Sequence, residues 1–158
     1  MTVELIRAST AEEPPAADRW PGRAERVLVV YCEGRGGEAA LREGATLAAG
    51  GAELTVVTLA PKAKSLRCCK GGGAGPWNCA IDDAADDDLR TAHTLLGTIA
   101  PRASFKKLAG TPWPPLGEWS AKSGFDVAIV PRDRFTRGGG RIARELRGAT
   151  TADVRLVG

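Results

Sequence analysis

The sequence predicts an α/β protein: a single three-layer αβα domain built on an open, five-stranded parallel sheet. Two observations favour this class. Continuous apolar runs such as RVLVVY and FDVAIVP are typical of strands that are covered on both faces. Segments with apolar residues at helical spacing alternate with these runs, so each strand is expected to be followed by a helix that returns the chain to the same end of the sheet.

Size and charge limit the possible functions. The chain has 158 residues and a formal net charge of +3. This length suits one domain with its own core, and the weak charge does not favour nucleic acid as a partner. No apolar run approaches the roughly 20 residues of a membrane span, and MTVELIRASTAEEPPAADRW lacks the basic start and apolar stretch of an export signal. We therefore expect a soluble, cytoplasmic protein whose four cysteines stay reduced.

We expect residues 1–24 to form an N-terminal arm and residues 25–158 to form the domain. AEEPPAADRWPGR is polar and broken by prolines, which indicates a flexible segment. MTVELIR alternates Val3 and Leu5 with polar neighbours, a pattern that suits a strand added to a sheet edge.

The first half of the domain is expected to contain two strands, RVLVVY and AELTVVTLAP, each followed by a helix. The first helix is EAALREGATLAAGG, which ends at a Gly-Gly stop. The second is DDAADDDLRTAHTLLGTIA, whose aspartates would lie in the first turns, where the positive end of the helix dipole favours them. Its apolar face would comprise Leu89, Ala92, Leu95, Leu96 and Ile99.

The second half is expected to contain three strands and two helices. ASFKKLAGTP, FDVAIVP and ADVRLVG are the strands, and PLGEWSAKSG is a short helix. GGRIARELRGA is a helix with Ile142, Ala143 and Leu146 turned inward. Trp113 and Trp119, before and within the short helix, are expected to cover the sheet.

Two long stretches resemble a known family. VLVVYCEGRGGEAALREGATLAAGGAELTVVTLAP has an apolar strand, a glycine turn, an alanine-rich helix and a Gly-Ala-Glu-Leu start to the second strand. FDVAIVP and the residues after it give a strand, a glycine loop, a helix and a strand. Over residues 25–158 the chain resembles the universal stress protein family, flavodoxin-like and Rossmann-like members of the adenine nucleotide alpha hydrolase-like superfamily. The resemblance implies a stress-response module, ATP or another adenine nucleotide as ligand, and a homodimer formed through ADVRLVG.

Two departures from the family pattern bear on function. Nucleotide-binding members carry an aspartate at the end of the first strand, where this chain has Cys32. They also have a Gly-x2-Gly-x9-Gly-Ser/Thr loop after the fourth strand, whereas PRDRFTRGGGRIARE is shorter and lacks the spaced glycines. We therefore predict a binding or regulatory module with a degenerate nucleotide or anion crevice and no catalytic residues. An ATP-binding protein with slow hydrolysis is the alternative.

The expected position of a crevice does not depend on the family. In open parallel sheets, ligands bind at the carboxyl ends of the strands, where the strand order reverses. The loops expected there are YCEGRGG and PRDRFTRGGG, and their arginines suit a phosphate-bearing ligand, with a solvated basic helix face as the alternative. The predicted crevice residues are Cys32, Gly34, Gly36, Gly37, Arg132, Arg134, Arg137, Gly138, Gly139 and Gly140.

A cysteine-rich segment, RCCKGGGAGPWNC, contains three of the four cysteines among basic residues and glycines. Positive neighbours favour the reactive thiolate, so Cys68 or Cys69 paired with Cys79 would form a thiol redox switch. The alternative is a flexible loop whose cysteines pack against Trp77. A zinc site completed by His93 is disfavoured, because the C-x2-C spacing is absent and His93 lies well inside its helix. We expect no resident metal.

Overall fold

A computed structural model describes residues 24–64, 74–132 and 138–158 of the chain. Nearly all of the predicted N-terminal arm lies outside these residues, as do Cys68, Cys69, Arg134 and Arg137.

The described residues form a five-stranded sheet in which every neighbouring pair is parallel, as predicted. The order across the sheet is β3-β2-β1-β4-β5. The strands are β1 (Arg26–Val30), β2 (Glu53–Pro61), β3 (Ala103–Gly110), β4 (Val127–Pro131) and β5 (Asp153–Val157). The register aligns Leu28 of β1 with Thr55 of β2 and with Ala128 of β4, which places three apolar strands at the centre of the domain.

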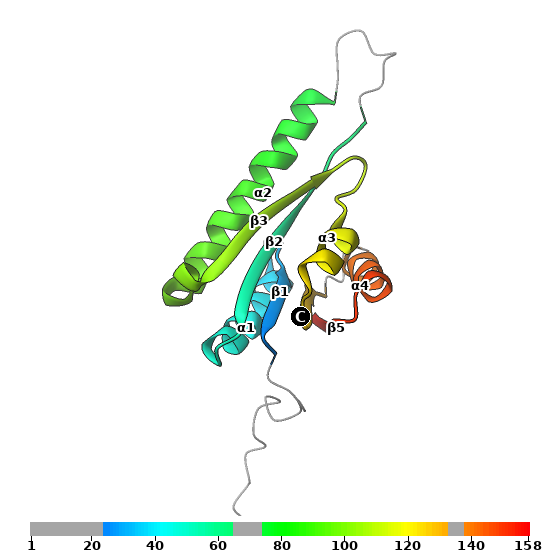
Figure 1. Ribbon diagram of the computed structural model, residues 1–158. Helices are drawn as coiled ribbons and strands as arrows, with labels where there is room; N and C mark the ends of the chain where they lie inside the picture. Colours follow the sequence, from blue (N-terminus) through cyan, green and yellow to red (C-terminus); the bar gives the residue numbers. More distant parts are fainter. Residues whose placement is uncertain (1–23, 65–73, 133–137) are drawn as a thin grey trace, which may run out of the picture.

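Helices cover both faces of the sheet, which confirms the three-layer architecture (Figure 1). The helices are α1 (Arg35–Ala49), α2 (Gly75–Leu96), α3 (Leu116–Ser123) and α4 (Gly138–Ala149), and a 3-10 helix, η2 (Gly97–Arg102), follows α2. One core cluster joins α1 and α2 to the sheet through side chains such as Leu41 and Leu96. A second joins α3 and α4 to the opposite face through Leu116 and Leu146. Trp113 and Trp119 pack against this second cluster, as expected.

Helix α2 differs from its prediction at the amino end. It begins at Gly75, with Pro76 in the first turn, seven residues before the predicted start at Asp82. Pro76 is well suited to this place because its missing N–H would have no partner there. The aspartates therefore lie in the middle of the helix, and the expected role of the helix dipole is wrong. The predicted apolar face is right for Ala92 and Leu96, which are buried, but wrong for Leu95, which is 52% exposed.

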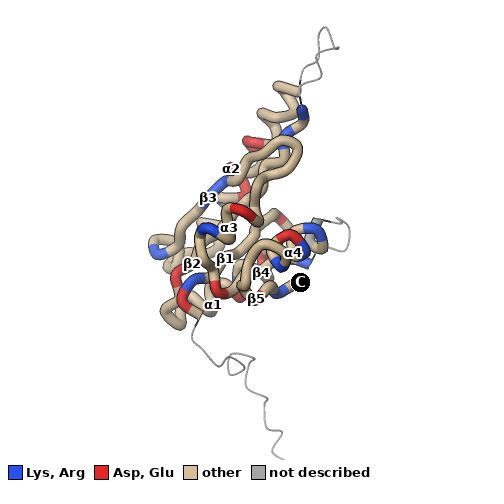
Figure 2. Tube along the Cα trace, turned by 45° about the vertical axis from the view of Figure 1, so that its right-hand side comes forward, with Lys and Arg blue, Asp and Glu red and all other residues tan. Residues whose placement is uncertain are grey.

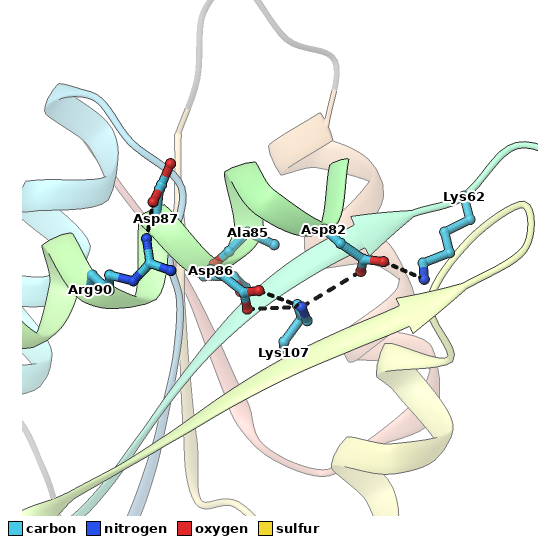
Figure 3. A network of polar contacts seen from close by, with 8 residues as sticks. Lys62, Asp82, Ala85, Asp86, Asp87, Arg90 and Lys107 are labelled. Atoms are coloured by element: carbon cyan, nitrogen blue, oxygen red, sulfur yellow. Dashed lines mark hydrogen bonds and ion pairs between the residues drawn. The ribbon is translucent and has the colours of Figure 1, made fainter. Parts of the chain in front are cut away.

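Strands β2 and β3 continue past the carboxyl end of β1. Val30 pairs with Val57, and residues 58–61 of β2 extend farther with only β3 beside them (Figure 1). Two lysines, one directly after β2 and one on β3, contact α2. Lys62 Nζ lies 2.6 Å from an Asp82 carboxylate oxygen, and Lys107 Nζ donates to Asp86 at 2.9 Å (Figure 3). The aspartate run thus binds the helix to the sheet. Within the described residues, no helix combines the length and apolar character needed to cross a membrane.

Candidate functional site

The strand order reverses between β1 and β4. From β1 the chain moves outward through β2 to β3, then returns to β4 and continues to β5. Val29 of β1 pairs with Ile129 of β4, so the carboxyl ends of these two strands are neighbours. In an open parallel sheet, this junction is where the loops diverge and a ligand binds. Among the described residues, the structure therefore places the loop after β1 beside Arg132, the residue that follows β4.

Three predicted crevice glycines have conformational or packing roles. Gly34 caps α1 with φ 123°, a conformation that favours glycine. A Cβ on Gly36 would lie 3.2 Å from the carbonyl oxygen of Arg132, and one on Gly37 would lie 1.8 Å from that of Cys32. The first turn of α1 is thus pressed against both loops. These glycines therefore allow the close packing of the junction, and this role does not depend on contact with a ligand.

The β1 side of the junction is acidic. Tyr31 is buried there, and the Glu33 N–H donates to an Asp88 carboxylate oxygen at 3.3 Å. Burial raises the pKa of Asp88 above its ordinary value, and the charge on Glu33 adds to this, while the Glu33 N–H partly opposes it. Burial, followed by the charges of Asp88, Glu33 and Glu38, raises the pKa of the Tyr31 hydroxyl. This side suits hydrogen-bond donors and repels phosphate.

The β4 side of the junction is basic. Exposed Arg132 follows β4, and its N–H donates to the carbonyl of Val157 at 2.6 Å, which fixes the backbone of Arg132 beside β5. Arg141, in the first turns of α4, lies over the Trp113 ring at 4.1 Å. Arginines recur along α4, where they are blue in Figure 2. Gly138, Gly139 and Gly140 begin α4, where backbone N–H groups favour an anion.

Glu145 connects α4 to α3 beside this basic side. One carboxylate oxygen accepts from the Trp113 indole N–H and the other from the Gly117 N–H, both at 2.8 Å. A Cβ on Gly117 would lie 2.9 Å from the Ala149 Cβ, so glycine also allows the close approach of the two helices. These contacts position the ring on which Arg141 lies.

The sequence interpretation missed Asp88, Trp113 and Glu145 as residues of the junction and its surroundings. Asp88 was one of several aspartates in a row, and only the helix register singles it out. Glu145 offered a signal, because it is an acid inside a strongly basic window. An acid in that setting indicates a specific partner, here an indole and a backbone amide.

The cysteine predictions are tested only in part. Cys32 is exposed at the junction. Cys79 is exposed too, but it lies on α2 and not in a loop. The proposed partners Cys68 and Cys69 lie outside the described residues, so the thiol switch stays a prediction.

No group of three potential metal ligands occurs among the described residues. Cys79 and His93 lie 14 positions apart on one helix, about 21 Å at the usual rise per residue. These two side chains therefore cannot bind the same zinc ion.

Two surface hollows lie beside α2, and Glu38 is in the lining of the first. One, of about 190 Å³, lies between α1 and α2 and includes Leu41 and Leu95 in its lining. The other, of about 430 Å³, lies between α2 and β3 and is lined by Leu89, Arg90, His93, Thr94 and Phe105.

No protein-family model and no curated protein sequence matches this chain. Solved structures do. A universal stress protein from Lactobacillus plantarum superposes with a TM-score of 0.63 at 18% identity, covering 87% of this chain and 99% of its own. A universal stress protein in complex with cAMP gives 0.57 at 17% identity, with the same coverage of both chains. One from Archaeoglobus fulgidus in complex with dAMP gives 0.53 at 14%, covering 85% of this chain and 98% of its own. At these identities, the comparison establishes the fold.

Proposed function

We propose that this chain, whose fold is that of universal stress proteins, is a cytoplasmic stress-response module that binds an adenine nucleotide at the β1–β4 junction. The observation that carries the proposal is the junction itself, where an acidic loop and a basic loop meet at the strand-order reversal. Proteins of the same fold bind cAMP and dAMP. The proposed activity is regulatory binding rather than turnover.

The charges favour one orientation of the ligand. The carboxylates of Glu33 and Glu38 are acceptors for ribose hydroxyls or an amino group, so the nucleoside belongs above the end of β1. The phosphate belongs beside Arg132 and the glycine run that begins α4. The extension of β2 and β3 would bound the nucleoside on one side. Because acidic groups occupy the β1 half, this arrangement favours a ligand with one phosphate over a triphosphate.

The test begins with native mass spectra of freshly purified protein handled without oxygen. These spectra report retained nucleotide, bound metal and subunit number together. Titration calorimetry with AMP, cAMP and ATP follows. We expect saturable binding of AMP and cAMP that weakens at least about tenfold in Arg132→Ala, because one charge-assisted contact is lost. Arg102→Ala, at the opposite end of the sheet, is the matched control. Equal binding in both variants, or none in the wild type, would refute the proposal.

A nucleotide-binding protein with slow ATP hydrolysis is the alternative, in which Cys32 replaces the usual aspartate without loss of binding. It predicts that ATP binds at least as tightly as AMP and that ADP accumulates over hours. Neither a bound triphosphate nor ADP is expected from the regulatory proposal. The same calorimetry, followed by nucleotide chromatography, separates the two.

We also propose a homodimer formed through β5. This strand is one of the two outermost strands of the sheet, so one side of its backbone has no strand beside it among the described residues. Its half-buried Leu156 and Val157 supply apolar surface next to that open side. Native mass spectra decide this point: a dimer that persists on tenfold dilution supports it, and a monomer at micromolar concentration refutes it.

A further inference from the structure

Strand β3 is the other outermost strand of the sheet, and it is the longer of the two. It has eight residues, whereas β5 has five. Gly110 accepts from the Lys62 N–H on the β2 side. Since peptide groups of alternate residues point to opposite sides of a strand, those of Phe105, Lys107 and Ala109 point away from β2. No described strand lies beside them. An open strand edge of this length, without proline, is a site where another strand adds.

The side chains beside this edge differ on the two faces of the sheet. On the α2 face, Phe105 contacts the His93 ring at 5.2 Å between centroids, and both line the open hollow of about 430 Å³. Half-buried Leu89 lines it as well. On the α3 face, exposed Lys106 lies over the Trp119 ring at 5.0 Å. A strand that fits here needs apolar side chains on one face and an acid on the other.

One segment of this chain has that pattern. In MTVELIR, Val3 and Leu5 alternate with Glu4, so the two apolar side chains fall on one face of a strand and the acid on the other. We infer that residues 2–7 pair with the open edge of β3, with Val3 and Leu5 over the α2-side hollow and Glu4 beside Lys106. This is recognition by strand addition, in which the backbone supplies affinity and the alternating side chains supply specificity.

The connecting chain is long enough. Ala24 packs at the amino end of the sheet, where the Glu53 N–H donates to the Glu25 carbonyl at 2.7 Å. From β1 to a new strand beyond β3 is three strand spacings, about 14 Å. The 16 residues from 8 to 23 span up to about 50 Å when extended. An antiparallel strand ends at the amino end of the sheet, which gives the shortest return to β1.

Amide hydrogen exchange, resolved by residue in NMR spectra, tests the inference on the full chain. The N–H groups of Phe105 and Lys107 are expected to exchange about tenfold or more slowly in the wild type than in Leu5→Asp, since each would lose one hydrogen bond. The N–H groups of Lys106 and Leu108, which point toward β2, are the internal reference and should not change.

Ala11→Asp is the matched control, because it adds the same charge to the same arm outside residues 2–7. It should exchange like the wild type. Equal exchange of the outward N–H groups in all three proteins would overturn the inference and leave β3 as an edge protected only by its lysines. Protection that disappears on dilution would overturn it too, because the added strand would then come from a second copy.

Discussion

The tightest packing at the proposed site is the contact of Gly37 with the carbonyl oxygen of Cys32, and Gly37→Ala tests its importance. The new Cβ would lie 1.8 Å from that oxygen, whereas real contacts of this kind are 3.0 Å or longer. The start of α1 would have to move by about 1.2 Å. A side chain could rotate away, but the obstacle is backbone. Overpacking of this kind costs about 1–3 kcal/mol, and a backbone obstacle favours the upper part of that range.

The assay is urea unfolding followed by circular dichroism, with thermal unfolding as a second measure. A loss of about 2–3 kcal/mol corresponds to a decrease in Tm of roughly 4–12 °C for a domain of this size. The slope of the urea transition should not change, because the same surface is exposed on unfolding. Nucleotide affinity should fall in the same variant, since the displaced turn contacts both loops of the junction.

Gly148→Ala is the matched control for this experiment. Gly148 lies in α4, and a Cβ there would have no neighbour within 4 Å. This substitution should therefore stabilise the protein by up to about 1 kcal/mol, because alanine has a higher helix propensity than glycine. The two variants should thus shift stability in opposite directions. If Gly37→Ala is within about 0.5 kcal/mol of the wild type, the packing argument is wrong.

Three further outcomes are expected. Glu145→Ala should cost about 2 kcal/mol in urea unfolding, because the Trp113 indole N–H and a backbone N–H lose a charged acceptor. Asp88→Asn should raise the free energy of unfolding near pH 7 but not near pH 3. Burial holds the pKa of Asp88 in the folded protein above its value in the unfolded chain. The stability of the wild type therefore falls as the pH rises through the folded pKa, and the neutral amide avoids this loss. Peroxide should join Cys79 to one of the two adjacent cysteines at 68 and 69, and Cys79→Ser should abolish this cross-link in peptide mass spectra.

Each of these outcomes has a control in the same chain. Glu118→Ala removes an exposed carboxylate paired with Lys122 and should leave the free energy of unfolding unchanged. If Glu145→Ala changes that free energy as little as Glu118→Ala does, the role assigned to Glu145 is contradicted. Asp83→Asn, at an exposed position of α2, should leave the free energy of unfolding within about 0.5 kcal/mol of the wild type. A gain for Asp88→Asn that is the same at both pH values would contradict the burial argument. A cross-link that survives Cys79→Ser would exclude Cys79 as the partner.

The strands and most helices could be predicted because their patterns are local. RVLVVY and FDVAIVP can be buried on both faces only as inner strands, and the structure places them as β1 and β4 at the centre of the sheet. Helix α2 was harder, because two explanations of its aspartates compete. A helix dipole would favour them at the start, whereas Lys62, directly after β2, and Lys107 on β3 favour them in the middle. The second explanation depends on tertiary contacts, which the sequence does not contain.

The junction was predicted in position but not in charge. The alternation of strands and helices predicts a parallel sheet with a ligand crevice at the carboxyl ends of its strands, and the structure makes β1 and β4 the neighbours at the strand-order reversal. The acidic character of the β1 side could not, because it depends on Asp88, which lies 55 positions from Glu33 along the chain. The packing of α2 on the sheet brings this carboxyl to the junction. Its burial there raises its pKa.

Helix α2 provides a physical connection between the proposed nucleotide site and the cysteine segment. Its 22 residues span about 33 Å. Exposed Trp77 and Cys79 lie near its amino end, and Asp88, farther along the helix, lies at the junction. Between these points Lys62, directly after β2, and Lys107 on β3 fix the helix to the sheet through Asp82 and Asp86 (Figure 3). A disulfide at Cys79 can therefore affect the junction only by moving this fixed helix. Lys107→Met, which releases Asp86, should then increase the effect of oxidation on nucleotide affinity if the sites are coupled, and should leave that effect at zero if they are independent.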